Sequence, residues 1–131
     1  MSHDREPGLE SRVVLVIDDD AFVGCAVACI LQEARQAQVY RARTANQALP
    51  LAATVCPDLI LCDVQMPGMS VLELCRGLRE DGATRQIPIY LLTGVMVGDR
   101  SLESLSPYVQ GVLSKPPDPA ELVAVFDRTC G

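Results

Sequence analysis

An α/β fold, with a five-stranded parallel sheet and helices on both faces, is predicted by two kinds of segment that alternate along this chain. Short apolar runs recur five times, four of them without a charged residue, and such runs are typical of strands buried on both sides. Between them, apolar residues recur at helical spacing. Strands that alternate with helices form a parallel sheet between two helical layers. With 131 residues, 49% of them hydrophobic, the chain can form one domain with a real core.

Five strands are expected from the apolar runs. They cover residues 13–17, 39–42, 59–62, 87–92 and 111–114. The first run, VVLVI, is rich in β-branched residues and ends abruptly in three consecutive aspartates. Several of the other runs also end at a polar residue, which makes the strand ends the places to look for chemistry.

Five helices are expected between and after these strands. They cover residues 21–36, 45–54, 71–79 and 100–105, and a last segment that begins at 119. An aspartate of the triple run can cap the first helix, and Thr44 can cap the second. The last helix has a strong start signal, because Asp118 stands at the N-cap position, Pro119 follows it, and Glu121 completes a capping box.

The domain is expected over residues 13–129. Residues 1–12 are polar, include Pro7 and Gly8, and are expected to form a disordered tail. The same boundaries leave no room for a second domain within these 131 residues.

Composition excludes several classes of function. The net charge of −6 argues against nucleic acid as a direct partner, because phosphate binding needs clustered Lys and Arg. No apolar stretch approaches the length of a membrane span, and the acidic N-terminal segment is not a signal peptide. The expected location is therefore cytoplasmic, with no membrane contact.

The six cysteines are expected to be free and mostly buried. None forms a C-x-x-C pair, and the only histidine is His3, so a zinc site is not indicated. Their even number leaves a disulfide framework as an alternative. Most of them lie in apolar runs, where reduced cysteine behaves as a small core residue, and a reducing compartment is expected.

The residues at the strand ends suggest a phosphoryl and metal site. They are Asp18, Asp19, Asp63, Thr93 and Lys115. The carboxyl ends of parallel strands meet at one sheet edge, where ligands bind. Clustered carboxylates recruit a cation such as Mg²⁺, while an ammonium and a hydroxyl suit phosphoryl oxygens. A carboxylate beside the metal could then attack phosphorus.

Four motifs in order make the chain resemble the receiver domain of two-component response regulators. They are VVLVIDDD, PDLILCDVQMPGM, IPIYLLTG and GVLSKP, within about residues 12–129. The intervals also agree with that family: 45 residues from Asp18 to Asp63, 30 more to Thr93 and 22 more to Lys115. The resemblance implies a doubly wound (βα)5 fold of the flavodoxin-like, CheY-like type, with strand order 2-1-3-4-5.

The resemblance also implies a role for each site residue. Asp63 would be the phosphoacceptor, and it would ligate Mg²⁺ or Mn²⁺ together with Asp19 and the backbone carbonyl of Gln65. Asp18 would belong to the metal's surroundings. Lys115 would pair with Asp63 and then with the phosphoryl group, and Thr93 would move towards that group as the switch step.

In that family the peptide between Lys115 and Pro116 is cis, as an X-Pro bond permits. The partners implied are a histidine kinase or histidine phosphotransfer protein upstream and an unknown protein target downstream. A homodimer is left open. The domain would be a phosphorylation-dependent switch that catalyses only its own phosphotransfer and autodephosphorylation.

Two departures from the family pattern affect the expected switch. Val112 stands where the family usually has an aromatic residue, so the ring rotation that accompanies Thr movement is absent. Ser70 and Val71 replace the usual Asp-Gly after the MPGM turn. Because Val does not tolerate positive φ as Gly does, this turn is expected to close differently.

The first expected helix carries no charge over residues 21–31. The side away from its Phe22 and Ile30 stripe holds small residues, at Gly24, Cys25, Ala28 and Cys29. This face is interpreted either as plain burial or as a docking surface for the phosphodonor, since an exposed apolar helix face usually means a partner.

Two other functions compete with a phospho-accepting receiver. A haloacid-dehalogenase-like phosphatase would use Asp18 as nucleophile with Asp20, Thr93 and Lys115, but it leaves Asp63 unexplained. A receiver-like module could also bind partners without phosphate, which the departure at Val112 favours.

Overall fold

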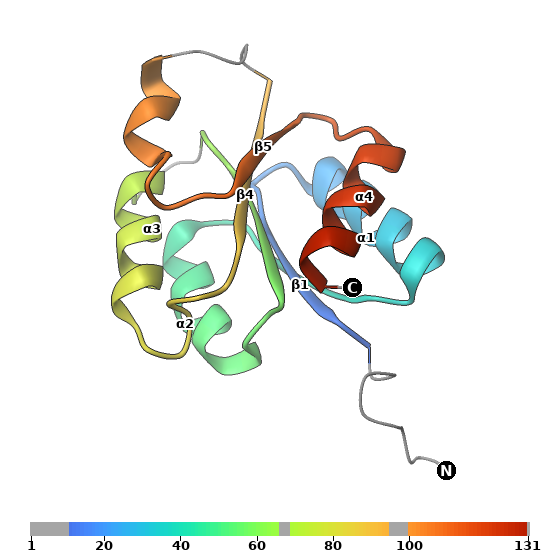
Figure 1. Ribbon diagram of the computed structural model, residues 1–131, viewed down its shortest axis with the longest axis horizontal. Coiled ribbons are helices and arrows are strands. Elements are labelled where there is room, and N and C mark those ends of the chain that lie inside the picture. Colours follow the sequence, from blue (N-terminus) through green and yellow to red (C-terminus); the bar gives the residue numbers. More distant parts are fainter. Residues whose placement is uncertain (1–10, 66–68, 95–99, 131) are drawn as a thin grey trace.

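A central parallel sheet lies between two layers of helices in the computed structural model, which describes residues 11–65, 69–94 and 100–130 (Figure 1). Its strands are β1 (Val13–Ile17), β2 (Gln38–Ala42), β3 (Leu59–Asp63), β4 (Ile89–Thr93) and β5 (Gly111–Ser114). Their order is β2-β1-β3-β4-β5, and all four neighbouring pairs are parallel. The predicted fold class and strand order are confirmed. Most of the predicted N-terminal tail, residues 1–10, lies outside the described part.

The fourth strand begins two residues later than its apolar run predicts. Pro88 has no N–H to give to a ladder. The N–H of Ile87 bonds to the carbonyl of Thr84, and the carbonyl of Ile87 accepts a bond from Arg79. The backbone of residue 87 is therefore held by the preceding loop, and sheet pairing starts only at Ile89.

The helices divide between the two faces of the sheet. On one face lie α1 (Ala21–Arg35) and α4 (Pro119–Cys130), and on the other lie α2 (Ala45–Val55) and α3 (Val71–Glu80), as Figure 1 shows. The predicted helix at residues 100–105 is a 3₁₀ helix, η1 (Arg100–Leu105), that packs beside α3. The described elements therefore include four α-helices where five helices were expected.

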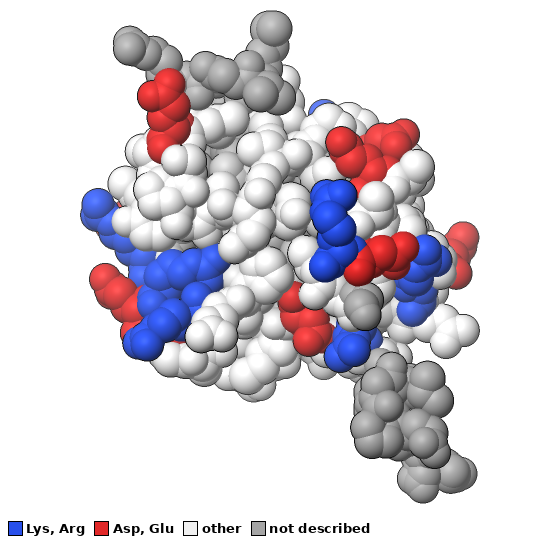
Figure 2. All heavy atoms as spheres, in the orientation of Figure 1, with Lys and Arg blue, Asp and Glu red and all other residues white. Residues whose placement is uncertain are grey.

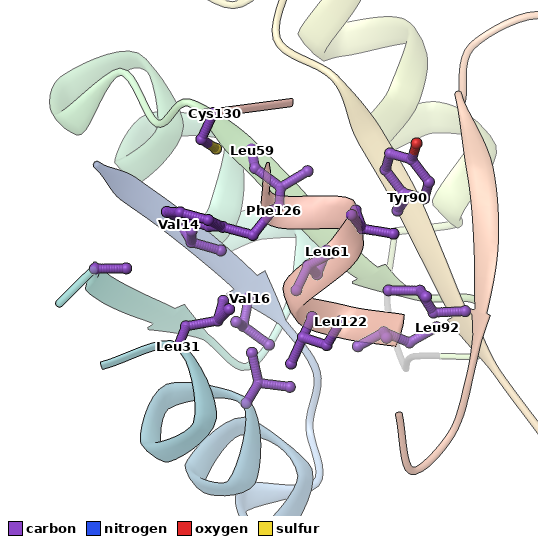
Figure 3. Packing of buried hydrophobic residues seen from close by; sticks show 14 of the residues in the cluster. Val14, Val16, Leu31, Leu59, Leu61, Tyr90, Leu92, Leu122, Phe126 and Cys130 are labelled. Carbon is purple, nitrogen blue, oxygen red and sulfur yellow. The ribbon is translucent and has the colours of Figure 1, made fainter. Parts of the chain in front are cut away.

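Strands β1, β3 and β4 each feed two separate hydrophobic clusters, because successive side chains point to opposite faces. Val14 and Val16 pack under α1 and α4, whereas Leu15 and Ile17 pack under α2 and α3. In the first cluster, Leu31 of α1 and Leu122 and Phe126 of α4 lie over the strands (Figure 3). Burial on both faces explains why the strands read as continuous apolar runs.

Side-chain caps begin the helices where the sequence indicates. Asp20 accepts a bond from Phe22 N in α1, Thr44 from Gln47 N in α2, and Asp118 from Glu121 N in α4. At α3, Ser70 and Glu73 form a reciprocal capping box. Ser70 has a φ of −69°, so the departure from Asp-Gly produces an ordinary N-cap with no positive φ.

All six cysteines are free, as predicted, but only half of them are buried. Cys62, Cys75 and Cys130 lie in the core, whereas Cys25, Cys29 and Cys56 are exposed. The expectation that most are buried was wrong, because helix α1 turns its Cys-bearing side to solvent and Cys56 lies at the C-cap of α2.

The surface shows intermingled charges rather than a basic face in the view of Figure 2, although blue groups gather over α3, which carries Arg76 and Arg79. Across residues 11–65, 69–94 and 100–130, no helix has the length and apolar character that crossing a bilayer requires.

Candidate functional site

Five predicted site residues lie at the carboxyl edge of the sheet, each at or just beyond the end of a strand. Asp18 and Asp19 follow β1, Asp63 ends β3, Thr93 ends β4, and Lys115 follows β5. Since all five strands are parallel and β1, β3, β4 and β5 are neighbours, their ends meet at one edge. The sequence pattern therefore predicted correctly that these strand ends meet at one edge of the sheet.

Lys115 is the cation at the centre of this edge. Its ammonium nitrogen Nζ lies 3.1 Å from Oδ2 of Asp63, and 3.3 and 3.2 Å from Oδ1 and Oδ2 of Asp18. Both carboxylates are almost fully buried, with residue exposures of 5% for Asp18 and 3% for Asp63. One ammonium therefore bridges two buried acids that come from different strands.

Backbone amides hold one oxygen of each of these acids. Oδ1 of Asp18 accepts a bond from Asp20 N at 2.8 Å, and Oδ1 of Asp63 accepts one from Gln65 N at 3.2 Å. Oδ2 of Asp18 has its ion pair with Lys115 but accepts no hydrogen bond from any described residue. A buried carboxylate oxygen without a hydrogen bond is costly, so this atom has capacity for a ligand.

Burial and the neighbouring charges shift the pKa values of Asp18 and Lys115. Burial raises the pKa of Asp18 most, and the charge of Asp63 raises it further, against the lowering effects of the Asp20 amide and Lys115. For Lys115, burial lowers the pKa, but the bonds and charges of Asp63 and Asp18 outweigh it and the pKa is raised. Lys115 therefore stays charged and holds the acids together.

Asp18, Asp19 and Asp63 could hold a metal ion. One carboxylate oxygen from each lies within 4.8 Å of the others, and Asp19 is exposed to solvent. Three hard oxygen donors with an open side suit Mg²⁺, which takes a few carboxylates and keeps several waters. The buried Asp18 oxygen that lacks a hydrogen bond agrees with the same donor set.

Thr93 and the Lys115–Pro116 bond complete the edge. Thr93 is buried and lies one residue beyond Leu92, which is the register partner of Asp63. The peptide bond between Lys115 and Pro116 is cis, as the resemblance implied.

The position of the expected switch aromatic is aliphatic and partly open. Val112 on β5 has 38% of its surface exposed, so no large group in the described structure covers it. Tyr90 is an aromatic residue on the neighbouring strand, but its ring packs against Gly111 on the opposite face of the sheet. It cannot substitute for a ring at position 112, because alternate strand residues face opposite sides.

Helix α1 presents an exposed face that agrees only in part with the predicted one. Its buried side holds Val23, Gly24, Val27 and Leu31. Phe22 is 76% exposed and lies three residues before Cys25, so it belongs to the same outward stripe as Cys25 and Cys29. Phe22 was not among the residues predicted for this face, although its spacing from Cys25 and Cys29 indicated it.

Gly24 is a correction to the predicted docking face. It is buried, and a Cβ built there would meet Nε of Arg41 at 2.8 Å. Arg41 of β2 also donates to the carbonyl of Ala21 at 3.1 Å. The guanidinium group therefore covers Gly24, whereas Cys25 and Cys29 are exposed and Ala28 is half-buried.

Asp20 has a structural task that separates it from the acid cluster. Its carboxylate caps α1 by accepting the Phe22 amide, and its side chain makes no ion pair with Lys115 in the described residues. A phosphatase with Asp18 and Asp20 as its catalytic acids is therefore not favoured, because Lys115 joins Asp18 to Asp63 instead.

Comparison with known proteins identifies relatives of this chain. The family model of the response regulator receiver domain matches residues 14–127. The chain is 34% identical to the response regulator PleD of Caulobacter vibrioides over 119 residues, which is 88% of this chain and 25% of PleD. It is 34% identical to the phosphate regulon regulator PhoB of Pseudomonas aeruginosa over 113 residues, or 86% of this chain and 49% of PhoB. The chain thus spans a quarter to a half of these relatives.

Solved structures show the same fold. The chemotaxis response regulator CheY4 of Vibrio cholerae superposes with a TM-score of 0.82 at 28% identity, covering 92% of this chain and 99% of CheY4. The receiver domain of a Pseudomonas aeruginosa sensor histidine kinase, described with magnesium in its active-site cleft, gives 0.83 at 23% identity and covers 93% and 99%. At that identity the second likeness concerns the fold alone.

Proposed function

Because the chain belongs to the response regulator receiver domain family, we propose that it accepts a phosphoryl group on Asp63 from a phosphohistidine and thereby switches its binding to a partner. The observation that carries the proposal is the position of Asp63. It is buried at a strand end, paired with Lys115, and close to the carboxylates of Asp18 and Asp19.

In the proposed transfer, a carboxylate oxygen of Asp63 attacks phosphorus and forms the new P–O bond. The P–N bond to the donor histidine breaks, and the histidine nitrogen keeps its electron pair. Lys115 orients Asp63 beforehand and afterwards pairs with a phosphoryl oxygen. Thr93 moves to donate its hydroxyl hydrogen bond to the phosphoryl group, which is the proposed switch step.

The proposed cofactor is Mg²⁺ or Mn²⁺. It would be held by Asp19, Asp63 and the backbone carbonyl of Gln65, with Asp18 in its immediate surroundings. The ion would supply positive charge that neutralises the phosphoryl oxygens as the attacking carboxylate approaches.

The domain acts in this proposal as a switch rather than as a turnover enzyme. Its only chemistry is the phosphorylation and dephosphorylation of its own Asp63. The upstream partner is a histidine kinase or histidine phosphotransfer protein, and the sensor histidine kinase AruS, 39% identical over 108 residues, supports that class of pathway. The proposed downstream target is a protein.

Intact-mass measurement after incubation with acetyl phosphate and Mg²⁺ tests the phosphoacceptor. We expect a species heavier by about 80 Da, one phosphoryl group, in the wild type. The variant Asp63→Asn should lack it, because its amide is a poor nucleophile. Chelation of the divalent ions should also abolish the species.

Asp20→Asn is the matched control, because Asn caps a helix as well as Asp and residue 20 lies outside the Lys115 ion pairs. It should label like the wild type. A wild type without the heavier species would contradict phospho-acceptance. Labelling that persists in Asp63→Asn and disappears in Asp18→Asn would favour the phosphatase.

A phosphate-independent binding module is the second candidate, and the exposed Val112 favours it. A receiver that lacks the aromatic side chain at position 112 lacks one means of transmitting a movement of Thr93 to its outer surface. Failure of the wild type to label, together with unchanged partner binding in Asp63→Asn, would support this candidate over the first.

The outward face of α1 is the proposed docking surface for the phosphodonor. Helix α1 begins immediately after the acid cluster, and its exposed side carries Phe22, Cys25 and Cys29 beside half-buried Ala28, with no charged residue before Glu33. An apolar surface next to a reaction site suits a partner that must bring its phosphohistidine close to Asp63.

A charge placed in this surface tests the docking proposal. Ala28→Glu should abolish phosphotransfer from the histidine-containing partner and leave acetyl phosphate labelling of Asp63 unchanged, since the site itself is not altered. Ala53→Glu, at a half-buried position of α2, is the matched control and should affect neither reaction. Equal loss of both reactions in Ala28→Glu would contradict docking at this face.

A further inference from the structure

Two exposed thiols lie side by side on the solvent face of α1. Cys25 and Cys29 are both free and exposed, and they are four residues apart in a continuous helix. Residues at that spacing are neighbours on a helix surface, with about 5–6 Å between their Cβ atoms. Neither thiol is needed for the core, since the buried residues of α1 are Val23, Gly24, Val27 and Leu31.

The two thiols also interact electrostatically. The charge of Cys25 is the largest cause that raises the pKa of Cys29, followed by partial burial, a bond to the Cys25 thiol and the charge of Glu33. Two thiolates at this distance therefore repel each other. A cation between them would remove that repulsion, as it does between paired carboxylates.

The spacing favours a bridging ion over a disulfide. A disulfide needs Cβ atoms about 3.5–4.5 Å apart, which is shorter than a helical pair allows without distortion. At roughly 2.3 Å per metal–sulfur bond, the value for zinc thiolates, a linear sulfur–metal–sulfur bridge spans about 4.6 Å between its sulfurs. Two cysteine side chains on neighbouring helix positions can place their sulfurs at that distance while the helix stays intact.

We propose that Cys25 and Cys29 form a two-sulfur site for a soft monovalent cation, of the class of Cu(I). Thiolates select soft ions over Mg²⁺, which prefers the oxygen ligands at the strand ends. Binding forms two metal–sulfur bonds and releases one proton from each thiol to solvent, with no change of oxidation state.

Titration of the folded chain with Cu(I), without oxygen and against a competing chelator, tests the site. We expect one ion per chain for the wild type. Cys25→Ser and Cys29→Ser should each lower the affinity by at least about tenfold, because loss of a ligand costs no less than loss of a supporting residue around a metal. Cys56→Ser is the matched control, since Cys56 is also exposed but lies at the C-cap of α2, and it should bind like the wild type.

Phenylarsine oxide gives an independent readout of paired thiols. It condenses with two thiols and releases one water, so the wild type and Cys56→Ser should form one bridged adduct that resists excess monothiol. Cys25→Ser and Cys29→Ser should not form it. Equal Cu(I) affinity in all four proteins, or an ion held only between two chains in native mass spectra, would overturn the proposal. Each substitution is on the surface, and circular dichroism checks that the variants are folded.

Discussion

At the scale of single residues, the site places two like charges close together in a buried position, which costs stability. Asp18 and Asp63 are both buried acids, and the ammonium of Lys115 bridges them at 3.1–3.3 Å. Burial and the charge of Asp63 raise the pKa of Asp18, which means that this acid takes up a proton more readily in the folded state than in the unfolded chain. Such groups are typical of functional sites, where stability is given up for chemistry.

Asp18→Asn should therefore stabilise the metal-free protein at neutral pH. The amide keeps the shape of the acid and removes the buried charge, so we expect the free energy of unfolding to rise by about 1 kcal/mol. Urea unfolding at pH 7 with a chelator measures the difference. Asp20→Asn, outside the ion pairs, is the control and should change the unfolding free energy much less.

The pH dependence of that gain has a definite sign. The folded pKa of Asp18 lies above its unfolded value of 3.8. The folded state thus binds more protons in the window above 3.8, and the wild type loses stability as the pH rises through the folded pKa. The advantage of Asp18→Asn should disappear below 3.8, where the acid is neutral in both states. An advantage that stays constant down to low pH would contradict this account.

At the scale of elements, helix starts are determined by local side-chain caps. The departure of Ser70 and Val71 from the family's Asp-Gly is explained at this scale. Ser70 accepts the amide of Glu73 at 3.1 Å, and the Glu73 carboxylate accepts the amide of Ser70 at 3.1 Å. Two otherwise unpaired donors at the start of α3 are satisfied, so this helix needs no glycine before it.

Ser70→Ala should destabilise the protein by about 1 kcal/mol, because the amide of Glu73 loses its acceptor. Thermal or urea unfolding measures the loss. Ser70→Thr keeps a hydroxyl at the same place and should retain most of the stability. If Ala and Thr variants were equally stable, the capping box would not be contributing.

At the scale of the whole molecule, the two hydrophobic clusters hold the layers together. Helices α1 and α4 also share an ion pair, in which Arg35 donates to both carboxylate oxygens of Asp127 at 2.7 Å. Both side chains of that pair are largely in solvent, at 40% and 47% exposure. Exposed pairs of this kind contribute little, so burial of apolar residues such as Leu122 must supply most of the association between α4 and the sheet.

A comparison of two truncations checks this ranking. Leu122→Ala should lower the free energy of unfolding by about 2–5 kcal/mol, because a fully buried side chain is replaced by a cavity. Arg35→Ala should cost only a small fraction of that, and the difference should shrink further in high salt. A larger loss for Arg35→Ala than for Leu122→Ala would mean that the ion pair, not the core, fixes α4.

The sequence by itself determined the local features of this protein. The apolar runs, the caps at Thr44 and Asp118, and the polar residues at the strand ends were readable because they depend on nearest neighbours and on periodicity. The sheet edge could be predicted as well, since parallel strands end together. Resemblance to a family supplied the strand order and the roles that are proposed for Asp63 and Lys115.

Only the tertiary structure decided which side of each element faces solvent. Residues 21–31 of helix α1 carry no charge on any side, so their pattern could not show that Phe22, Cys25 and Cys29 lie outside while Gly24 lies under Arg41 of β2. Likewise, Val112 is exposed because no surrounding element covers it fully, and its neighbours in sequence do not reveal this. Burial is a property of contacts between distant segments, and periodicity specifies it only where polar residues mark the outer face.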